Sequence, residues 1–176
     1  MQKYSKPEKV IVSENDWKQI FNDTYKNIER KLDAAKSLTD HDAELSAGLY
    51  TYAIEEFGKL LLLKQCNFQN GECIIRYRDE FVNHTYKFGI AFDYLQNNNA
   101  GHCILLTQGD FSIQDFAWRD FYVGLPADFE SRLSIFYSDF SIHDNGTVEI
   151  VPVPKVDETY LRRAIDGLEK ALLQLS

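Results

Sequence analysis

The chain has no apolar run long enough to cross a membrane. The run Leu60–Leu63 is flanked by Lys59 and Lys64, and a membrane helix needs about 20 apolar residues. The first residues are rich in lysine and contain no apolar core of the kind found in signal peptides. We therefore expect a cytoplasmic protein that does not bind a membrane.

Cysteine is scarce and shows no metal-binding pattern. Cys66, Cys73 and Cys103 form no C-x-x-C pair, and no two histidines have ligand spacing. The sequence therefore predicts neither a metal site nor a cofactor. An odd number of cysteines without an export signal indicates reduced thiols, although Cys66 and Cys73 could pair across a short loop.

Basic residues are too few for a protein that coats nucleic acid. The 19 Lys and Arg face 27 Asp and Glu, which gives a net charge of −8. Binding along a nucleic acid depends on neutralising phosphates, so we expect no DNA partner. An enzyme that cleaves RNA with a few well-placed cations stays possible.

Helical periodicity accounts for most of the 176 residues, which we interpret as one domain, 1–176. Residues 1–12 read as a loose arm, and Ser13 reads as the N-cap of the first helix. Four long amphipathic helices with short connections predict a mainly α fold, a four-helix bundle. Their expected ranges are 13–38, 42–65, 75–96 and 157–175.

An insertion of short helices and a β-hairpin is expected at 101–155, between the third and fourth long helices. Asp144-Asn145-Gly146 separates two β-favouring runs, 135–142 and 147–153, and Asn-Gly at such a place is a strong hairpin signal. Within the insertion an aromatic cluster could stack bases or form a small satellite core; it comprises Phe116, Trp118, Phe121 and Tyr122.

The second predicted helix carries Glu55, Glu56 and Lys59. Spacing places Glu56 on the buried face, with Lys59 within reach of both carboxylates. The pair could be a structural ion pair between helices, or a buried carboxylate that orients a cation. Gly58 lowers helix propensity, which suggests that another helix approaches closely there.

The third predicted helix carries His84 on its apolar seam, between Phe81 and Phe88. A lone histidine there could simply be a hydrogen-bonded core residue. However, Arg78 precedes it, and on an ideal helix the two point about 120° apart, so they meet through the reach of arginine or across a dimer. Arginine, histidine and an acid suit RNA cleavage without a metal, because imidazole can accept the 2′-hydroxyl proton and guanidinium can hold the phosphate.

The Arg78 to His84 stretch resembles the signature of HEPN domains: arginine, a polar residue (Asp79), and histidine after five intervening residues in all. Three further segments resemble the AbiV-type abortive-infection branch of that superfamily. They are Tyr50–Lys59, His84-x-x-Lys87, and Phe136–Phe140 with the turn and Pro152 that follow. Together these features cover residues 40–154 and fit the same bundle.

The resemblance implies a helical domain, a homodimer with the Arg/His helix at its two-fold axis, and antiviral defence by toxicity to the phage-infected cell. It implies that Arg78 binds phosphate and that His84 is the general base or acid. It also implies supporting roles: Glu56 and Asp79 orient these groups, Lys59 and Lys87 add positive potential, and Glu55 lies beside them.

Three hypotheses remain open for this HEPN-like bundle. The first is a toxin that acts as a metal-independent ribonuclease at a dimeric Arg/His site. The second is a non-catalytic dimer that binds a phage or host protein and blocks translation. In the third, the polar seam only specifies helix register or the dimer.

Overall fold

The computed structural model describes residues 8–98, 106–107, 139–142, 146–151, 155–156 and 158–175. The short helices expected inside 101–155, the aromatic cluster and Cys103 lie outside these residues. In the part that is described, no helix combines the length and the apolar character needed to cross a membrane.

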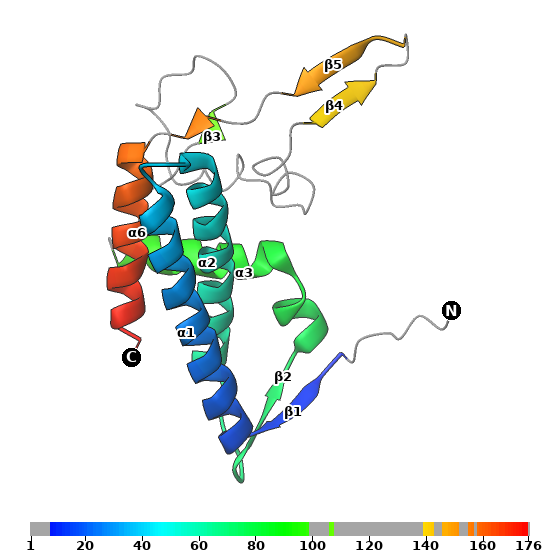
Figure 1. The fold of residues 1–176 in the computed structure, drawn as a ribbon. Helices are drawn as coiled ribbons and strands as arrows, with labels where there is room; N and C mark the ends of the chain where they lie inside the picture. The colour runs from blue at the N-terminus through cyan, green and yellow to red at the C-terminus, as the bar shows by residue number, and fades with distance from the viewer. Residues whose placement is uncertain are drawn as a thin grey trace.

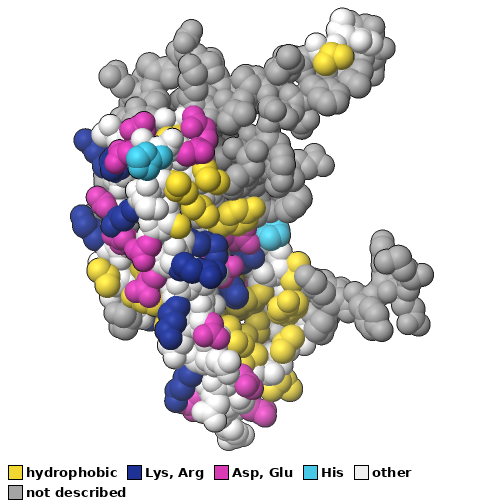
Figure 2. All heavy atoms as spheres, viewed as in Figure 1, with side chains coloured by type: hydrophobic (Ala, Val, Ile, Leu, Met, Phe, Trp, Pro, Cys, Tyr) yellow, Lys and Arg dark blue, Asp and Glu magenta, His cyan; other side chains and the backbone are white. Residues whose placement is uncertain are grey.

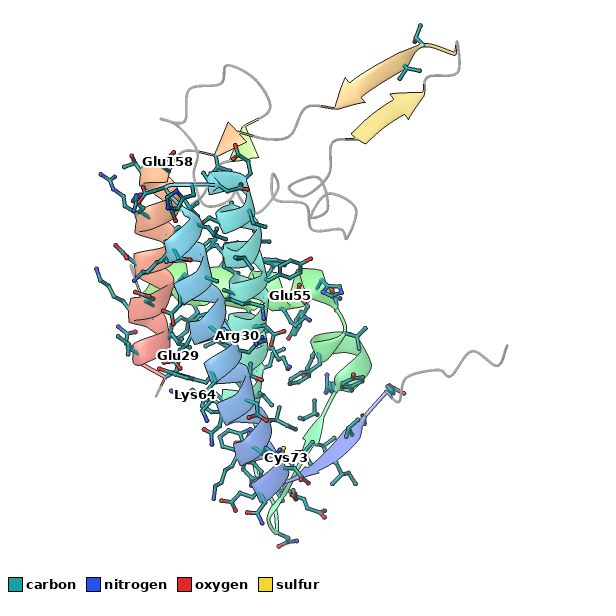
Figure 3. All side chains as sticks on the ribbon, in the orientation of Figure 1. Glu29, Arg30, Glu55, Lys64, Cys73 and Glu158 are labelled. Atoms are coloured by element: carbon teal, nitrogen blue, oxygen red, sulfur yellow. The ribbon has the colours of Figure 1, made fainter. Side chains whose placement is uncertain are left out.

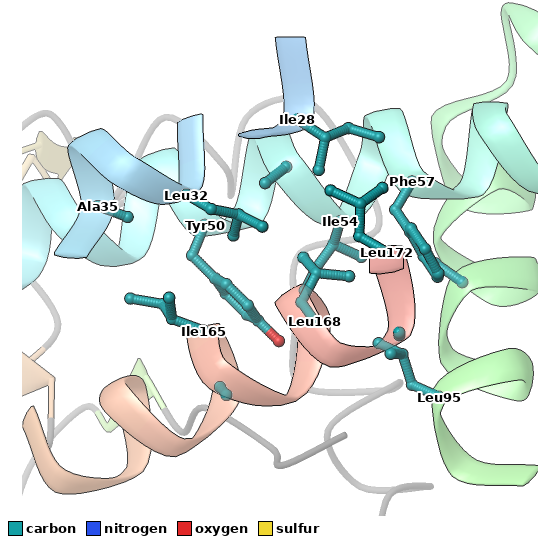
Figure 4. Packing of buried hydrophobic residues seen from close by; sticks show 14 of the residues in the cluster. Ile28, Leu32, Ala35, Tyr50, Ile54, Phe57, Leu95, Ile165, Leu168 and Leu172 are labelled. Atoms are coloured by element: carbon teal, nitrogen blue, oxygen red, sulfur yellow. The ribbon is translucent and has the colours of Figure 1, made fainter. Parts of the chain in front are cut away.

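The chain is mainly helical, and three long helices lie side by side (Figure 1). They are α1 (Glu14–Leu38), α2 (Ala43–Lys64) and α6 (Glu158–Leu173). The expectations of long helices at 13–38, 42–65 and 157–175 are therefore confirmed. The fourth, α3 (His84–Asn97), crosses behind α2 instead of lining up with it (Figures 1 and 4).

Side-chain caps set where the first two helices begin. The hydroxyl of Ser13 accepts a hydrogen bond from the backbone N–H of Asp16 at 3.1 Å, as the sequence predicts. Asp42 caps α2 by accepting from the backbone N–H of Leu45 at 2.9 Å. Each cap satisfies an N–H group that has no partner inside its helix.

A two-stranded antiparallel ribbon closes the end of the molecule where α1 begins. It pairs β1 (Val10–Ser13) with β2 (Glu72–Ile75), in the register Val10↔Ile75 to Ser13↔Glu72. The expectation of a loose arm is therefore wrong for residues 10–12. The turn before β2 has positive φ at Asn70 (54°) and Gly71 (81°), and it lies in the connection expected between residues 65 and 75.

The predicted hairpin is confirmed for the residues of it that the structure describes. β4 (Asp139–Ile142) pairs antiparallel with β5 (Val148–Val151), and Asp139 lies opposite Val151. A further short pair joins β3 (Leu106–Thr107) to β6 (Lys155–Val156).

The continuous third helix expected at 75–96 is wrong. After β2 the chain forms one π-helical turn, η1 (Tyr77–Phe81), in which the N–H of Val82 donates to the carbonyl of Tyr77 at 3.1 Å. The side chain of Asn83 then accepts from the N–H of Tyr86 at 3.1 Å and starts α3. The spacing of Tyr77 and Phe81 imitates a helix because η1 also turns, but a new helix needs a new cap.

The main core surrounds α2, which contacts α1, α3 and α6 (Figure 4). Between Tyr50 and Leu63 only three residues of α2 are not buried: Tyr52, Glu56 and Lys59. A helix that is apolar on nearly every side has to be central. The largest fully buried side chains of this core include Ile28, Leu32, Tyr50, Ile54, Phe57, Leu60, Leu95, Leu161, Ile165 and Leu168.

Gly58 is where α3 comes closest to α2. A Cβ built on Gly58 would lie 2.0 Å from the backbone oxygen of Lys87. The close helix approach that the sequence suggests is thus confirmed, and the neighbour is backbone that cannot rotate away. Only glycine allows this crossing.

We predict that Gly58→Ala destabilises the protein by about 1–3 kcal/mol, because α3 must move away from α2. The free energy of unfolding from urea titration measures the effect. The sign is diagnostic, since alanine in an unobstructed helix stabilises by about 1 kcal/mol relative to glycine. Equal or greater stability of the variant would contradict the close approach.

Candidate functional site

One carboxylate of α2 holds two side chains from the start of α3. Oε1 of Glu55 accepts a hydrogen bond from Nζ of Lys87 at 2.7 Å and lies 2.6 Å from Nδ1 of His84. The side chains of Glu55 and Lys87 are only 10% and 7% exposed, whereas that of His84 is 45% exposed. The cluster thus consists of the buried ion pair of Glu55 and Lys87 and the imidazole ring of His84, which reaches solvent. Glu55 is labelled in Figure 3.

The local sequence explains this geometry. Gly58, one turn after Glu55, lets the backbone of α3 approach at Lys87. His84 and Lys87 are three residues apart and therefore lie on one side of the helix. Since Asn83 caps α3, His84 is its first residue, and it lies at the edge of the core instead of inside it.

Charge decides the form of the cluster. Burial raises the pKa of Glu55, but the hydrogen bonds and positive charge of Lys87, together with those of His84, outweigh burial and bring the pKa below the ordinary value. The carboxylate is therefore ionised at neutral pH and can only accept hydrogen bonds. Nδ1 of His84 must then carry the hydrogen, and in the neutral ring Nε2 keeps a free lone pair.

Two of the predicted site residues lie elsewhere than expected. His84 is not on a buried seam, because the helix that would bury it begins at His84 itself. Glu56 is not on the buried face; it lies on the partly exposed stripe of α2, where its Oε2 is 3.5 Å from Nζ of Lys59. The acid that contacts His84 is Glu55, and no ion pair between Glu55 and Lys59 is present.

Arg78 and Asp79 belong to η1 by their backbone, while their side chains lie outside the described part of the structure. Single π-turns are frequent at functional sites. Because η1 and α3 are separate elements, the offset of an ideal helix does not apply to Arg78 and His84. The geometric reason for a dimer therefore falls away, and the homodimer is expected from the family resemblance.

A cation that the sequence did not single out lies beside the cluster. Burial lowers the pKa of Lys31 on α1, and the negative charge of Glu56 partly offsets this effect. The positive charge of Lys59 lowers the pKa further, and the negative charge of Glu55 raises it. Figure 2 shows Lys and Arg side chains gathered on this face, next to acidic side chains and a histidine. Lys31 follows the buried Ile28 by three residues and precedes the buried Ala35 by four, a spacing that marks the edge of a core stripe.

Other chemistries find no support among the described residues. No group of three or more His, Cys, Asp or Glu side chains there could hold a metal ion. Cys66 and Cys73 are free thiols, as the sequence indicates. Burial and contact with Cys73 raise the pKa of Cys66 to about 12, so this thiol is no nucleophile at neutral pH.

Comparison with protein-family models, with curated proteins and with solved structures finds no match for this chain. What the site does must therefore follow from its own chemistry, together with the resemblance in the sequence.

We predict that Glu55→Gln destabilises the fold by about 3–5 kcal/mol at pH 7, because it leaves the buried ammonium of Lys87 without a counter-ion. Glu56→Gln is the matched control, and it should cost about 1 kcal/mol or less because the pair with Lys59 is partly exposed. Urea unfolding of the three proteins measures both values.

The penalty of Glu55→Gln should depend on pH. Because the folded state lowers the pKa of Glu55, its stabilisation is complete above the ordinary value of 4.5 and is lost as the pH falls through the folded value. The difference between wild type and Glu55→Gln should therefore shrink at acidic pH. A penalty that is constant from pH 7 into the acidic range would show that the charge of Glu55 is not the cause.

Proposed function

We propose that this chain is an AbiV-type abortive-infection protein of the HEPN superfamily, a toxin that cleaves RNA without a metal during defence against phage. The observation that supports this most is the contact of Glu55 with His84, which leaves Nε2 of an accessible imidazole free to accept a proton. The assignment to the family rests on the sequence motifs.

The reaction is an internal attack. Nε2 of His84 takes the proton of a ribose 2′-hydroxyl, and the 2′-oxygen attacks the adjacent phosphorus. The bond from phosphorus to the 5′-oxygen breaks, which gives a 2′,3′-cyclic phosphate and a 5′-hydroxyl end. A protonated imidazole then supplies the proton of the leaving oxygen, and DNA is excluded because it lacks the attacking group.

The other motif residues have electrostatic roles in this proposal. The guanidinium of Arg78 holds the phosphate and stabilises the charge that develops on it. Glu55 fixes the tautomer of His84, as carboxylates commonly do for catalytic imidazoles, and Lys87 keeps Glu55 ionised. The protein acts as a cytoplasmic homodimer with this region at its two-fold interface, and no cofactor is needed.

A second candidate is a non-catalytic dimer that binds a phage or host protein and blocks translation. One specific observation favours it: Ile11 and Ile74 are directly paired across the β1–β2 ribbon, and each is 66% exposed. Such a pair, on a chain with a net charge of −8, suits a protein partner better than a nucleic acid.

We predict that purified protein cleaves single-stranded RNA in the presence of EDTA and leaves 2′,3′-cyclic phosphate ends. His84→Asn should lower the rate by about 100-fold or more, because the proton acceptor is lost. His41→Asn is the matched control and should cleave at the wild-type rate, since His41 is exposed at the α1–α2 connection. Single-turnover cleavage of a labelled oligonucleotide measures all three.

Equal rates of RNA cleavage by His84→Asn and wild type would contradict the ribonuclease proposal. The second candidate predicts a different pattern in cells. Toxicity would survive His84→Asn but would be lost when Ile11 and Ile74 are both replaced by lysine. Growth after induced expression of each variant separates the two functions.

A further inference from the structure

We infer that Lys31 and Lys59 form a phosphate-binding subsite that holds single-stranded RNA against α1 and α2, beside His84. This deepens the proposed function and rests on it. It adds Lys31, a residue outside every motif discussed above, and it gives Lys59 a defined ligand.

The placement comes from the two helices. Lys59 belongs to the partly exposed stripe of α2, and Lys31 lies on α1, which packs against α2, within electrostatic reach of Glu56, Lys59 and Glu55. Because Glu55 contacts His84 and the next residue, Glu56, lies 3.5 Å from Lys59, Lys59 and the proposed base lie near the same turn of α2. A strand bound over Lys31 and Lys59 would therefore continue toward His84.

The charges on this surface do not cancel. Glu55 forms an ion pair with Lys87, in which Oε1 and Nζ are 2.7 Å apart. Oε2 of Glu56 lies 3.5 Å from Nζ of Lys59. Among the described residues no carboxylate lies within 4.0 Å of Nζ of Lys31. Arg30, which precedes Lys31 on α1, adds a further cation, and within the described part of the chain its side chain donates only to the side-chain oxygen of Asn27, at 2.9 Å.

Lys31 is partly removed from solvent in this arrangement. Burial lowers its pKa, and partial desolvation without a close counter-ion is unfavourable. A group kept under such conditions is a candidate for binding a ligand. A phosphate oxygen would supply the missing negative charge, and successive phosphates of a flexible single strand could meet both ammonium groups.

The subsite also fits the overall acidity of the chain. A net charge of −8 repels RNA from most of the surface, so that local cations decide where a strand can lie. Binding by a few contacts predicts weak, strongly salt-dependent association.

Fluorescence anisotropy with a 2′-O-methyl single-stranded oligonucleotide, which cannot undergo the internal attack, tests the subsite apart from cleavage. Lys31→Gln and Lys59→Gln should each weaken binding about tenfold, as expected for loss of one charge-assisted contact. Each should also lower the slope of log K against log salt by about 0.7. Lys31→Arg should retain wild-type binding.

Lys26→Gln is the matched control, because it removes one charge from an exposed position of the same helix and should leave binding and slope unchanged. Thermal unfolding should show Lys31→Gln to be at least as stable as wild type, whereas a purely structural lysine would lower the melting temperature when replaced. Equal binding by Lys31→Gln and Lys26→Gln would overturn the subsite, as would a wild type that does not bind the oligonucleotide.

The two proposals can fail separately. Binding that depends on Lys31, without cleavage of natural RNA, would remove the ribonuclease and keep the subsite. Cleavage that depends on His84, with binding indifferent to Lys31 and Lys59, would keep the ribonuclease and overturn the subsite.

Discussion

A single oxygen atom, Oε1 of Glu55, connects the central helix α2 to the start of α3. It receives the ammonium of Lys87 and Nδ1 of His84 within 2.7 Å. This contact exists only because Gly58 lets the backbone of Lys87 come close. The crossing of the helices, the neutralisation of a buried lysine and the orientation of the histidine are therefore one arrangement.

Burying such a pair is expensive, and apolar side chains of the same volume often serve stability as well or better. The arrangement does something that apolar residues cannot do, because it places an oriented imidazole at the surface on a rigid support. The supporting groups are buried in the helical core, whereas the ring extends to solvent. Rigid positioning of this kind is what proton transfer requires.

Stability and the proposed chemistry are coupled at Glu55 but not at Lys31. Any change of Glu55 leaves the ammonium of Lys87 without this counter-ion and also removes the carboxylate that contacts His84. Lys31 contributes no close ion pair within the described residues, so its role can be separated from folding. The face that carries these groups thus combines the structural ion pair of Glu55 and Lys87 with Lys31, which has no ion pair to any described residue.

Much of the fold could be predicted from the sequence, because its signals are local. The cap at Ser13, the stripes of α1 and α6 and the turn at Gly146 depend on neighbours along the chain. The start of α3 could not be predicted in this way, since Tyr77 and Phe81 continue the apparent period and only the cap at Asn83 breaks it.

The sequence predicted which residues belong to the candidate site better than it predicted how they are arranged. The motif residues named His84, Glu55 and Lys87, and these three do meet. Periodicity placed Glu56 on the buried face and missed Glu55, because α2 is buried on almost every side and both positions border apolar residues. The choice depends on Lys87, which only the tertiary packing of α3 brings to Glu55.

The tautomer of His84 tests the central claim most directly. Long-range proton–nitrogen correlation spectra of imidazole rings distinguish the two nitrogens, and the His84→Asn spectrum identifies the signal. At a pH where the ring is neutral, the account predicts a hydrogen on Nδ1 and a lone pair on Nε2, with this preference lost in Glu55→Gln. A ring that carries its hydrogen on Nε2 in the wild type would contradict the account.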